Sequence, residues 1–208
     1  MASNKSETAV IKKRYDRLAP FFDAMEGCLE WAFFKRWREI VWSKVQGPRI
    51  LEVGVGTGKN FPYYPPGSEI VAVDFSGKML QRARNKSSAK GIDVELQLMD
   101  VQQLAFADNS FDTVVATFVF CSVPESLKGL QELHRVCRPG GRLVLLEHVL
   151  SSRPLPARIM NVLNPLVVRM AGANINRKTL DTVRQSGFHS LQLDPVSGDV
   201  VKLFTAIK

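Results

Sequence analysis

The chain has 208 residues, of which 45% are hydrophobic and 23% charged, with 14 Gly and 11 Pro. This length and balance predict one globular domain with a sizeable core and exclude the disordered and fibrous classes. The net charge of +8 favours an anionic partner, such as nucleic acid, a lipid surface or an acidic ligand, although an inert basic surface has the same total.

The cysteines and the N-terminal residues indicate the cellular compartment in which the protein works. Cys28, Cys121 and Cys137 are scattered and form no C-x-x-C pair, and the chain has only three histidines. We therefore expect no disulfide framework and no metal site. The sequence opens without the apolar segment of a signal peptide and holds no apolar run long enough to span a bilayer, so we expect a cytoplasmic protein.

Residues 1–46 are expected to form a helical lid segment ahead of the core. Five apolar residues of segment 25–44 fall on one helical stripe: Met25, Leu29, Phe33, Trp37 and Val41. Three aromatic residues fall off that stripe, among lysines and arginines: Trp31, Phe34 and Trp42. These aromatics either fill a lid over the domain or form an apolar surface with basic flanks that faces anionic lipid.

From residue 47 to residue 208 the sequence predicts a Rossmann-like α/β core. Strands are predicted at 49–55, 69–75, 94–100, 111–120, 142–149 and 200–208, and helices at 76–91, 125–141 and 176–188. Ser76 is the expected N-cap of the first of these helices and Gly91 its stop. Continuous apolar strands alternating with helices indicate a mostly parallel sheet covered on both faces. Ligands of such sheets bind beyond the carboxyl ends of the strands.

A second basic segment follows the fifth predicted strand. Residues 151–188 carry six Lys and Arg against one Asp, and residues 154–170 mix apolar residues with Arg158, Arg169 and interior prolines. We expect an insertion near 151–175 on the acceptor side of the core. Like segment 25–44, it either packs on the domain or faces a lipid surface.

The stretch LEVGVGTGKN (51–60) places Gly54, Gly56 and Gly58 directly behind a buried strand. A tight turn without a ligand would explain a lone glycine pattern, but two carboxylates accompany this one. Asp74 ends the next predicted strand, where it can accept the hydroxyls of a ribose, and Asp100 ends the third, where it can meet an adenine amino group. The spacing is G-x-G-x-G and lacks the last glycine of a dinucleotide site, and no Walker motif occurs. We therefore expect an adenosine ligand without a pyrophosphate.

In chain order, LEVGVGTG, VAVDFS, LMD, FDTVVATFVF and RPGGRLVLLEH resemble the class I S-adenosylmethionine-dependent methyltransferases, over roughly residues 45–150. YDRLAPFFDAME and the tail NRKTLDTVRQSGF resemble a smaller group within the class. That group holds bacterial phosphatidylethanolamine N-methyltransferases, ubiquinone/menaquinone C-methyltransferases and membrane-associated thiol methyltransferases. The resemblance implies a seven-stranded, mostly parallel sheet with an antiparallel last strand, and S-adenosyl-L-methionine as the cofactor.

The resemblance also implies a cofactor-binding set. Its members are Tyr15, Glu52, Gly54, Gly56, Gly58, Asp74, Phe75, Met79, Asp100, Val101, Thr117 and Phe118. The residues of the glycine loop would hold the methionine part, Asp74 the ribose, and Phe75 and Met79 the two sides of the adenine. Asp100 and Val101 would bind the adenine edge. The backbone of residues 117–118 would meet the ammonium, and Tyr15 would close the pocket.

Methyl transfer from a sulfonium requires alignment and exclusion of water more than a dedicated nucleophile. No Ser-His-Asp or Cys-His arrangement is evident. An amine acceptor must first lose its proton, and His148 is the first candidate for the base, with Tyr15 second. A structural histidine hydrogen-bonded to backbone is the alternative for His148.

The acceptor class is narrowed by missing motifs. No Asp-Pro-Pro-Tyr, Asn-Pro-Pro-Tyr or Pro-Cys occurs, so a nucleic acid acceptor is not expected, and the fourth strand ends without a carboxylate for a metal-dependent reaction. We expect an amphiphilic or lipid-like acceptor, with a phospholipid amine first and peripheral binding to an anionic membrane. A small thiol and a quinone precursor are alternatives within the class. A cofactor-binding regulatory module without turnover is the alternative outside it.

Overall fold

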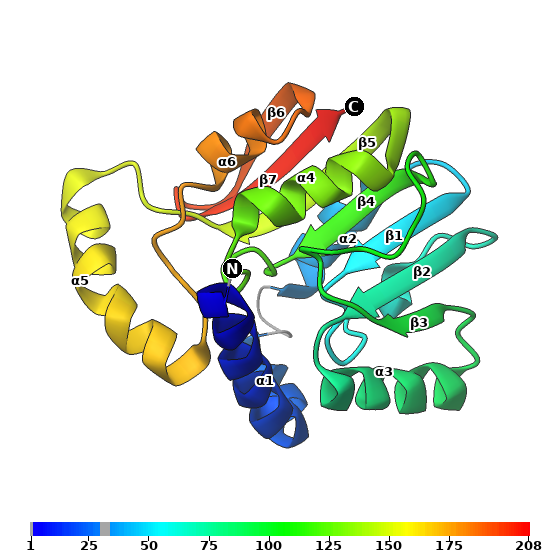
Figure 1. The fold of residues 1–208 in the computed structure, drawn as a ribbon, viewed down its shortest axis with the longest axis horizontal. Coiled ribbons are helices and arrows are strands. Elements are labelled where there is room, and N and C mark those ends of the chain that lie inside the picture. The colour runs from blue at the N-terminus through cyan, green and yellow to red at the C-terminus, as the bar shows by residue number, and fades with distance from the viewer. Residues whose placement is uncertain (1, 30–33) are drawn as a thin grey trace.

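A seven-stranded sheet forms the centre of the molecule (Figure 1). The computed structural model describes the backbone of residues 2–29 and 34–208, and the side chains of residues 7–22, 34–169 and 172–208. The strands are β1 (Arg49–Val53), β2 (Glu69–Asp74), β3 (Glu95–Leu98), β4 (Phe111–Thr117), β5 (Cys137–His148), β6 (His189–Ser197) and β7 (Val201–Ile207). Their order is β3-β2-β1-β4-β5-β7-β6.

Strands β1 to β5 run parallel, and β7 lies antiparallel between β5 and β6. The expected seven-stranded, mostly parallel sheet with an antiparallel last strand is therefore confirmed. Strand β6 was not among the predicted strands. It lies at the sheet edge, is only partly buried and contains Pro195, so it lacks the apolar run that marks the buried strands.

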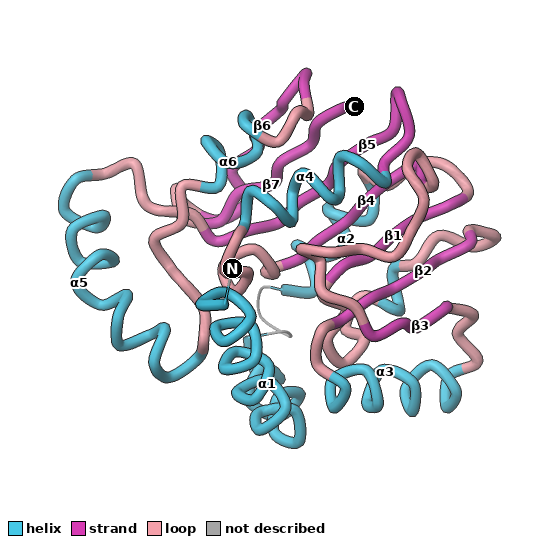
Figure 2. Tube along the Cα trace, in the orientation of Figure 1, coloured by secondary structure: helices cyan, strands magenta, loops and turns pink. Residues whose placement is uncertain are grey.

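Helices cover both faces of the sheet (Figure 2). They are α1 (Ala2–Leu29), α2 (Lys35–Ser43), α3 (Gly77–Lys90), α4 (Ser126–Val136), α5 (Pro154–Ala171) and α6 (Thr179–Gln185), with a 3-10 turn η2 at Phe61–Tyr63. Side chains of α4 and α6 pack on one face, while α2 and α3 pack on the other. Such burial on both faces explains why the central strands read as continuous apolar runs.

Local sequence signals fix several helix ends. The Ser76 hydroxyl accepts a hydrogen bond from the Met79 N–H, and Gly91 ends α3 in the left-handed region at φ 62°, so both expected caps of this helix are confirmed. Helix α4 is shorter than the predicted 125–141. It ends at Val136 because Cys137 already pairs with Phe111 of β4.

The aromatic residues of segment 25–44 do not form a free apolar surface where the structure describes them. Trp42 is only 5% exposed and packs on Tyr64, while Phe34 is half-buried between Trp37 and Phe118. The lipid-facing alternative is therefore wrong for these two side chains. Trp31 and Phe33 lie outside the described residues, as do the side chains of Met25 and Leu29.

Within the described residues, no helix combines the length and the apolar character that crossing a membrane requires.

Candidate active site

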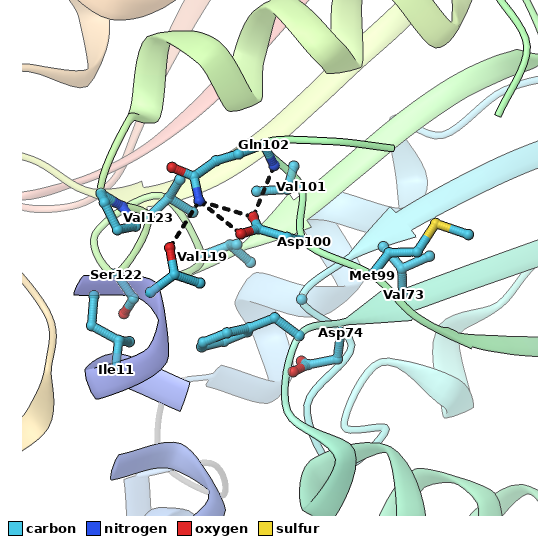
Figure 3. A pocket seen from close by; sticks show the side chains of 14 residues that line it. Ile11, Val73, Asp74, Met99, Asp100, Val101, Gln102, Val119, Ser122 and Val123 are labelled. Atoms are coloured by element: carbon cyan, nitrogen blue, oxygen red, sulfur yellow. Dashed lines mark hydrogen bonds between the residues drawn. The ribbon is translucent and has the colours of Figure 1, made fainter. Parts of the chain in front are cut away.

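A cleft opens at the carboxyl ends of the parallel strands, where the order changes direction between β1 and β4 (Figure 3). It encloses about 440 Å³ of empty space, part of it open to solvent. Its lining comes from the ends of β1, β2 and β3, from the turn after β4 and from α1: Thr8, Ile11, Gly54, Val73, Asp74, Phe75, Met99, Asp100, Val101, Gln102, Val119, Ser122, Val123 and Pro124.

The glycine loop bends sharply at the floor of this cleft. Gly54 has φ 69°, and a Cβ atom there would collide with the Val119 side chain. Gly56, at φ 56°, donates its backbone N–H to the Asp74 carboxylate at 2.9 Å. Gly58 serves the turn and not the lining, because a Cβ there would collide with the Phe61 ring. The loop therefore offers backbone, without side chains, to whatever enters beside Gly54.

Asp74 lies at the end of β2 with 6% of its surface exposed. One carboxylate oxygen accepts from Gly56 and the other from the Ser76 N–H at 2.8 Å. Burial raises the pKa of Asp74 to about 6, although these backbone hydrogen bonds act in the opposite direction. The carboxylate also accepts from the Phe75 backbone, and its two oxygens together keep lone-pair capacity for a further donor, such as a sugar hydroxyl.

Asp100 lies just after β3 and lines the same cleft as Phe75 and Met99. Its carboxylate accepts from the Gln102 N–H at 2.9 Å and from the Gln102 side-chain amide (Figure 3). The amide oxygen of Gln102 in turn accepts from the Glu125 N–H at 3.0 Å, at the start of α4. Gln102 thus fixes the direction of the Asp100 carboxylate beside the apolar part of the cleft.

Helix α1 supplies Thr8 and Ile11 to the cleft lining and is held there by polar contacts. The Tyr15 hydroxyl shares a hydrogen bond of 2.6 Å with Ser122, and its ring meets the edge of Phe75. Asp16 accepts from the Ser76 hydroxyl at 2.6 Å. Burial raises the pKa of Tyr15 above its usual value, so the phenol stays protonated at neutral pH.

The turn after β4 lines part of the cleft, and hydrogen bonds from its backbone to Glu147 hold it in place. Phe118 adopts φ 56°, and Glu147 accepts from the Val119 and Phe120 N–H groups at 2.8 and 2.9 Å. Glu147 is fully buried, and its other oxygen has no hydrogen-bond partner in the described part of the chain. Burial raises the pKa of Glu147 to about 7, with nearby Arg177 acting in the opposite direction.

The structure brings five of the predicted cofactor residues into the lining: Gly54, Asp74, Phe75, Asp100 and Val101. Gly56 and Tyr15 contact these residues directly. Met79 is buried in the first turn of α3. The Thr117 hydroxyl accepts from Asn60 at 3.3 Å.

Glu52, at the end of β1, is not among the described residues that line the cleft. Its carboxylate accepts from the Asn60 amide at 2.6 Å and from the Tyr64 hydroxyl, and it is almost fully buried. Burial raises its pKa. In this position Glu52 holds the segment after the glycine loop, and its assignment to the methionine part of a cofactor stays a prediction.

His148 is half-buried at the end of β5 and packs on the Phe118 ring, with 5.3 Å between the ring centroids. It is absent from the cleft lining in the part of the chain that the structure describes. Burial lowers the pKa of His148, so its imidazole is neutral at pH 7. A hydrogen bond with the Val200 backbone acts against this shift. A neutral imidazole can accept a proton, which is what the base hypothesis requires.

Sequence reasoning missed several lining residues. Ile11 lies one helical turn before Tyr15 and Thr8 lies two turns before it, so helical spacing from the predicted lid residue could have found them. Gln102 and Ser122 also line the cleft and carry no motif of their own. Ser122 comes there with the turn after β4, and Gln102 directly follows the predicted Asp100 and Val101.

These side chains fit an adenosine-bearing ligand. Two carboxylates at the ends of neighbouring strands can accept from a ribose and an adenine amino group, apolar side chains line the same cleft, and bare backbone at Gly54 admits a close approach. Fold and cleft together thus define a doubly wound α/β protein with a nucleoside-binding site at its topological switch point.

Comparison with known proteins supplies the family. Residues 51–145 match the family described as methyltransferase domain. A phosphatidylethanolamine N-methyltransferase from Cereibacter sphaeroides is 46% identical over 105 residues, which is 50% of this chain and 52% of that protein. A demethylmenaquinone methyltransferase from Renibacterium salmoninarum is 35% identical over 169 residues, 79% of this chain and 68% of that protein.

Two further relatives extend the comparison. Thiol S-methyltransferase TMT1B from Rattus norvegicus is 34% identical over 151 residues, 70% of this chain and 62% of that protein. The crystal structure of a SAM-dependent methyltransferase from Thermotoga maritima superposes with a TM-score of 0.72 at 19% identity, covering 94% of this chain and 99% of that one. At this identity the structure shows a shared fold.

The chain belongs to the class I S-adenosylmethionine-dependent methyltransferases, and S-adenosylmethionine is the cofactor of this family. It spans about half the length (52%) of the phosphatidylethanolamine N-methyltransferase that it matches. When bound, S-adenosylmethionine supplies a methyl group that its sulfonium already activates.

Proposed function

We propose that this enzyme methylates the amine of a phospholipid of the phosphatidylethanolamine type. The observation that carries the proposal is the cleft, in which Asp74 and Asp100 accompany the bare backbone of Gly54. The similarity to a phosphatidylethanolamine N-methyltransferase supports the choice of acceptor. Relatives named for thiol and for demethylmenaquinone methylation keep a small thiol and a quinone precursor as alternatives.

In this proposal, residues 1–46 act as the helical lid, and the segment near 151–175 lies on the acceptor side. His148, neutral because of its burial, takes the proton that the acceptor ammonium must lose. Tyr15 holds the lid closed through Ser122. The acceptor resides in a membrane, so the protein works at the cytoplasmic surface of an anionic bilayer, where its charge of +8 favours binding.

The test is release of S-adenosylhomocysteine in the presence of phosphatidylethanolamine vesicles, an alkyl thiol or a demethylated quinol. We expect turnover with the phospholipid and its loss in Asp74→Ala, since that variant lacks the carboxylate that is expected to bind the ribose. Turnover with the thiol or the quinol alone would move the acceptor to that class. Cofactor binding without turnover on any acceptor would identify a regulatory module instead.

A further inference from the structure

Helix α5 presents an exposed apolar face. Its large apolar side chains with the highest exposure recur at helical spacing, at positions 155, 159, 162, 163 and 166, so they share one side of the helix. Leu155 is 70% exposed and Val162 is 72% exposed. Most of the large exposed hydrophobic side chains in the described part of the protein lie on this one helix.

The opposite side of α5 is anchored by polar contacts near its second half. Asn164 bonds with Asn174 at 3.1 Å and accepts from the Ile175 N–H at 2.9 Å. Arg14 of α1 donates to the Val168 carbonyl. Between described residues, no other helix or strand packs extensively on α5, and Figure 1 shows it at the side of the molecule, beyond α1 and α6. The helix is therefore fixed in place, while its apolar face meets no partner among the described residues.

The charges around this face have one sign. Arg153, Arg158 and Arg169 are exposed, and the sequence holds no Asp or Glu between Leu150 and Leu180. A symmetric contact between two copies of the chain would bring these arginines together without acidic partners from α5. An apolar face flanked by arginines is instead typical of a helix that lies in the interface of an anionic bilayer.

The placement of α5 connects this face to the cleft. The segment that returns from α5 holds the turn after β4, because Asn174 donates to the Cys121 carbonyl at 2.8 Å and Arg177 donates to the Val123 carbonyl at 2.7 Å. That turn supplies Val119, Ser122 and Val123 to the cleft lining. A surface that binds α5 therefore lies near the acceptor side of the cleft.

We propose that α5 docks the protein on an anionic phospholipid bilayer, with its apolar face inserted at the boundary between headgroups and acyl chains. The sequence offered two candidates for this contact, segment 25–44 and residues 154–170, and the structure leaves a free apolar surface on the second, in α5. Only the biological choice of lipid rests on the proposed function. Vesicle binding is measured without turnover, so the docking proposal and the proposed function can fail separately.

The experiment is flotation of the full chain with phosphatidylcholine vesicles that contain or lack phosphatidylglycerol, at low and high salt. The test variant is Leu155→Ser/Val162→Ser, and the matched control is Leu98→Ser on the remote strand β3, where the side chain is 56% exposed. We expect wild type and the control to bind anionic vesicles and the double variant to bind at least about tenfold more weakly, because two apolar side chains no longer insert. Arg158→Gln/Arg169→Gln should weaken binding mainly at low salt.

Circular dichroism and calorimetry with the cofactor serve as folding controls. The circular dichroism spectrum and the cofactor affinity of the double variant should equal those of wild type. The proposal is overturned if wild type does not float with anionic vesicles at low salt. It is also overturned if Leu155→Ser/Val162→Ser binds as wild type does, or if Leu98→Ser weakens binding equally. A wild-type dimer that the double variant dissociates, without vesicle binding, would assign the face to a contact between copies.

Discussion

At the scale of single residues, Asp74 carries two tasks: it fixes the backbone of the glycine loop and offers lone pairs to a ribose. Replacing it with Asn keeps its size and one carbonyl oxygen but removes the charge. Losing hydrogen bonds to a charged acceptor in a buried site costs about 1–3 kcal/mol, so we expect S-adenosylmethionine affinity to fall at least fivefold. Titration calorimetry measures this, with the exposed Asp93→Asn as control. Equal affinities for wild type and Asp74→Asn would remove Asp74 from the ribose site.

His148 offers a second test at this scale. A base must be deprotonated to act, and burial lowers the pKa of His148 below its usual 6.5. The rate on an amine acceptor should therefore rise as the pH increases through the lowered pKa of His148. In His148→Gln this limb of the pH–rate profile should flatten, while the exposed His189→Gln keeps it. A profile unchanged in His148→Gln would give His148 a structural role beside Phe118.

At the scale of elements, the turn after β4 depends on the segment that follows α5. Arg177 binds the Val123 carbonyl, and Val123 lines the cofactor cleft. Arg177→Met keeps the apolar stem but frees this carbonyl, so the turn should loosen and cofactor affinity should fall about three- to tenfold. The exposed neighbour Lys178→Met is the control. Unchanged affinity in Arg177→Met, measured by calorimetry on folded protein, would show that the turn holds its shape without this contact.

At the scale of the whole molecule, buried carboxyl groups make stability depend on pH. The pKa of Glu147 rises from 4.5 to about 7 on folding, because burial disfavours the carboxylate. The folded state therefore binds more protons than the unfolded state between these values. The stability from this group is complete below about 4.5 and is lost as pH rises through about 7, by at most ~3 kcal/mol.

Glu147→Gln keeps an acceptor for the Val119 and Phe120 N–H groups but cannot ionise. Urea unfolding between pH 4.5 and 8 should show a flatter fall of the unfolding free energy in this variant than in wild type, and the exposed Glu95→Gln should follow wild type. Parallel curves for Glu147→Gln and wild type would mean that Glu147 does not change its protonation on folding.

The sequence by itself determined the class of fold and the cofactor. Strands buried on both faces must be apolar throughout, and turns at positive φ favour glycine. The sequence therefore predicted strands β1, β2, β4 and β5, the turn at Gly54, and the strand-end residues Asp74 and Asp100. The sequence also predicted the caps Ser76 and Gly91, because a cap acts within a few residues of its own helix.

The tertiary structure alone decided which apolar residues are covered and which polar groups meet. Trp42 and Leu155 are both large, apolar and near arginines in sequence, yet one lies in the core and the other in solvent. Edge strand β6 and the clamp of Glu147, Asn174 and Arg177 on the turn after β4 likewise join segments far apart in the chain. Burial and long-range hydrogen bonds depend on which surfaces the packed elements turn toward each other, and no local pattern encodes that choice.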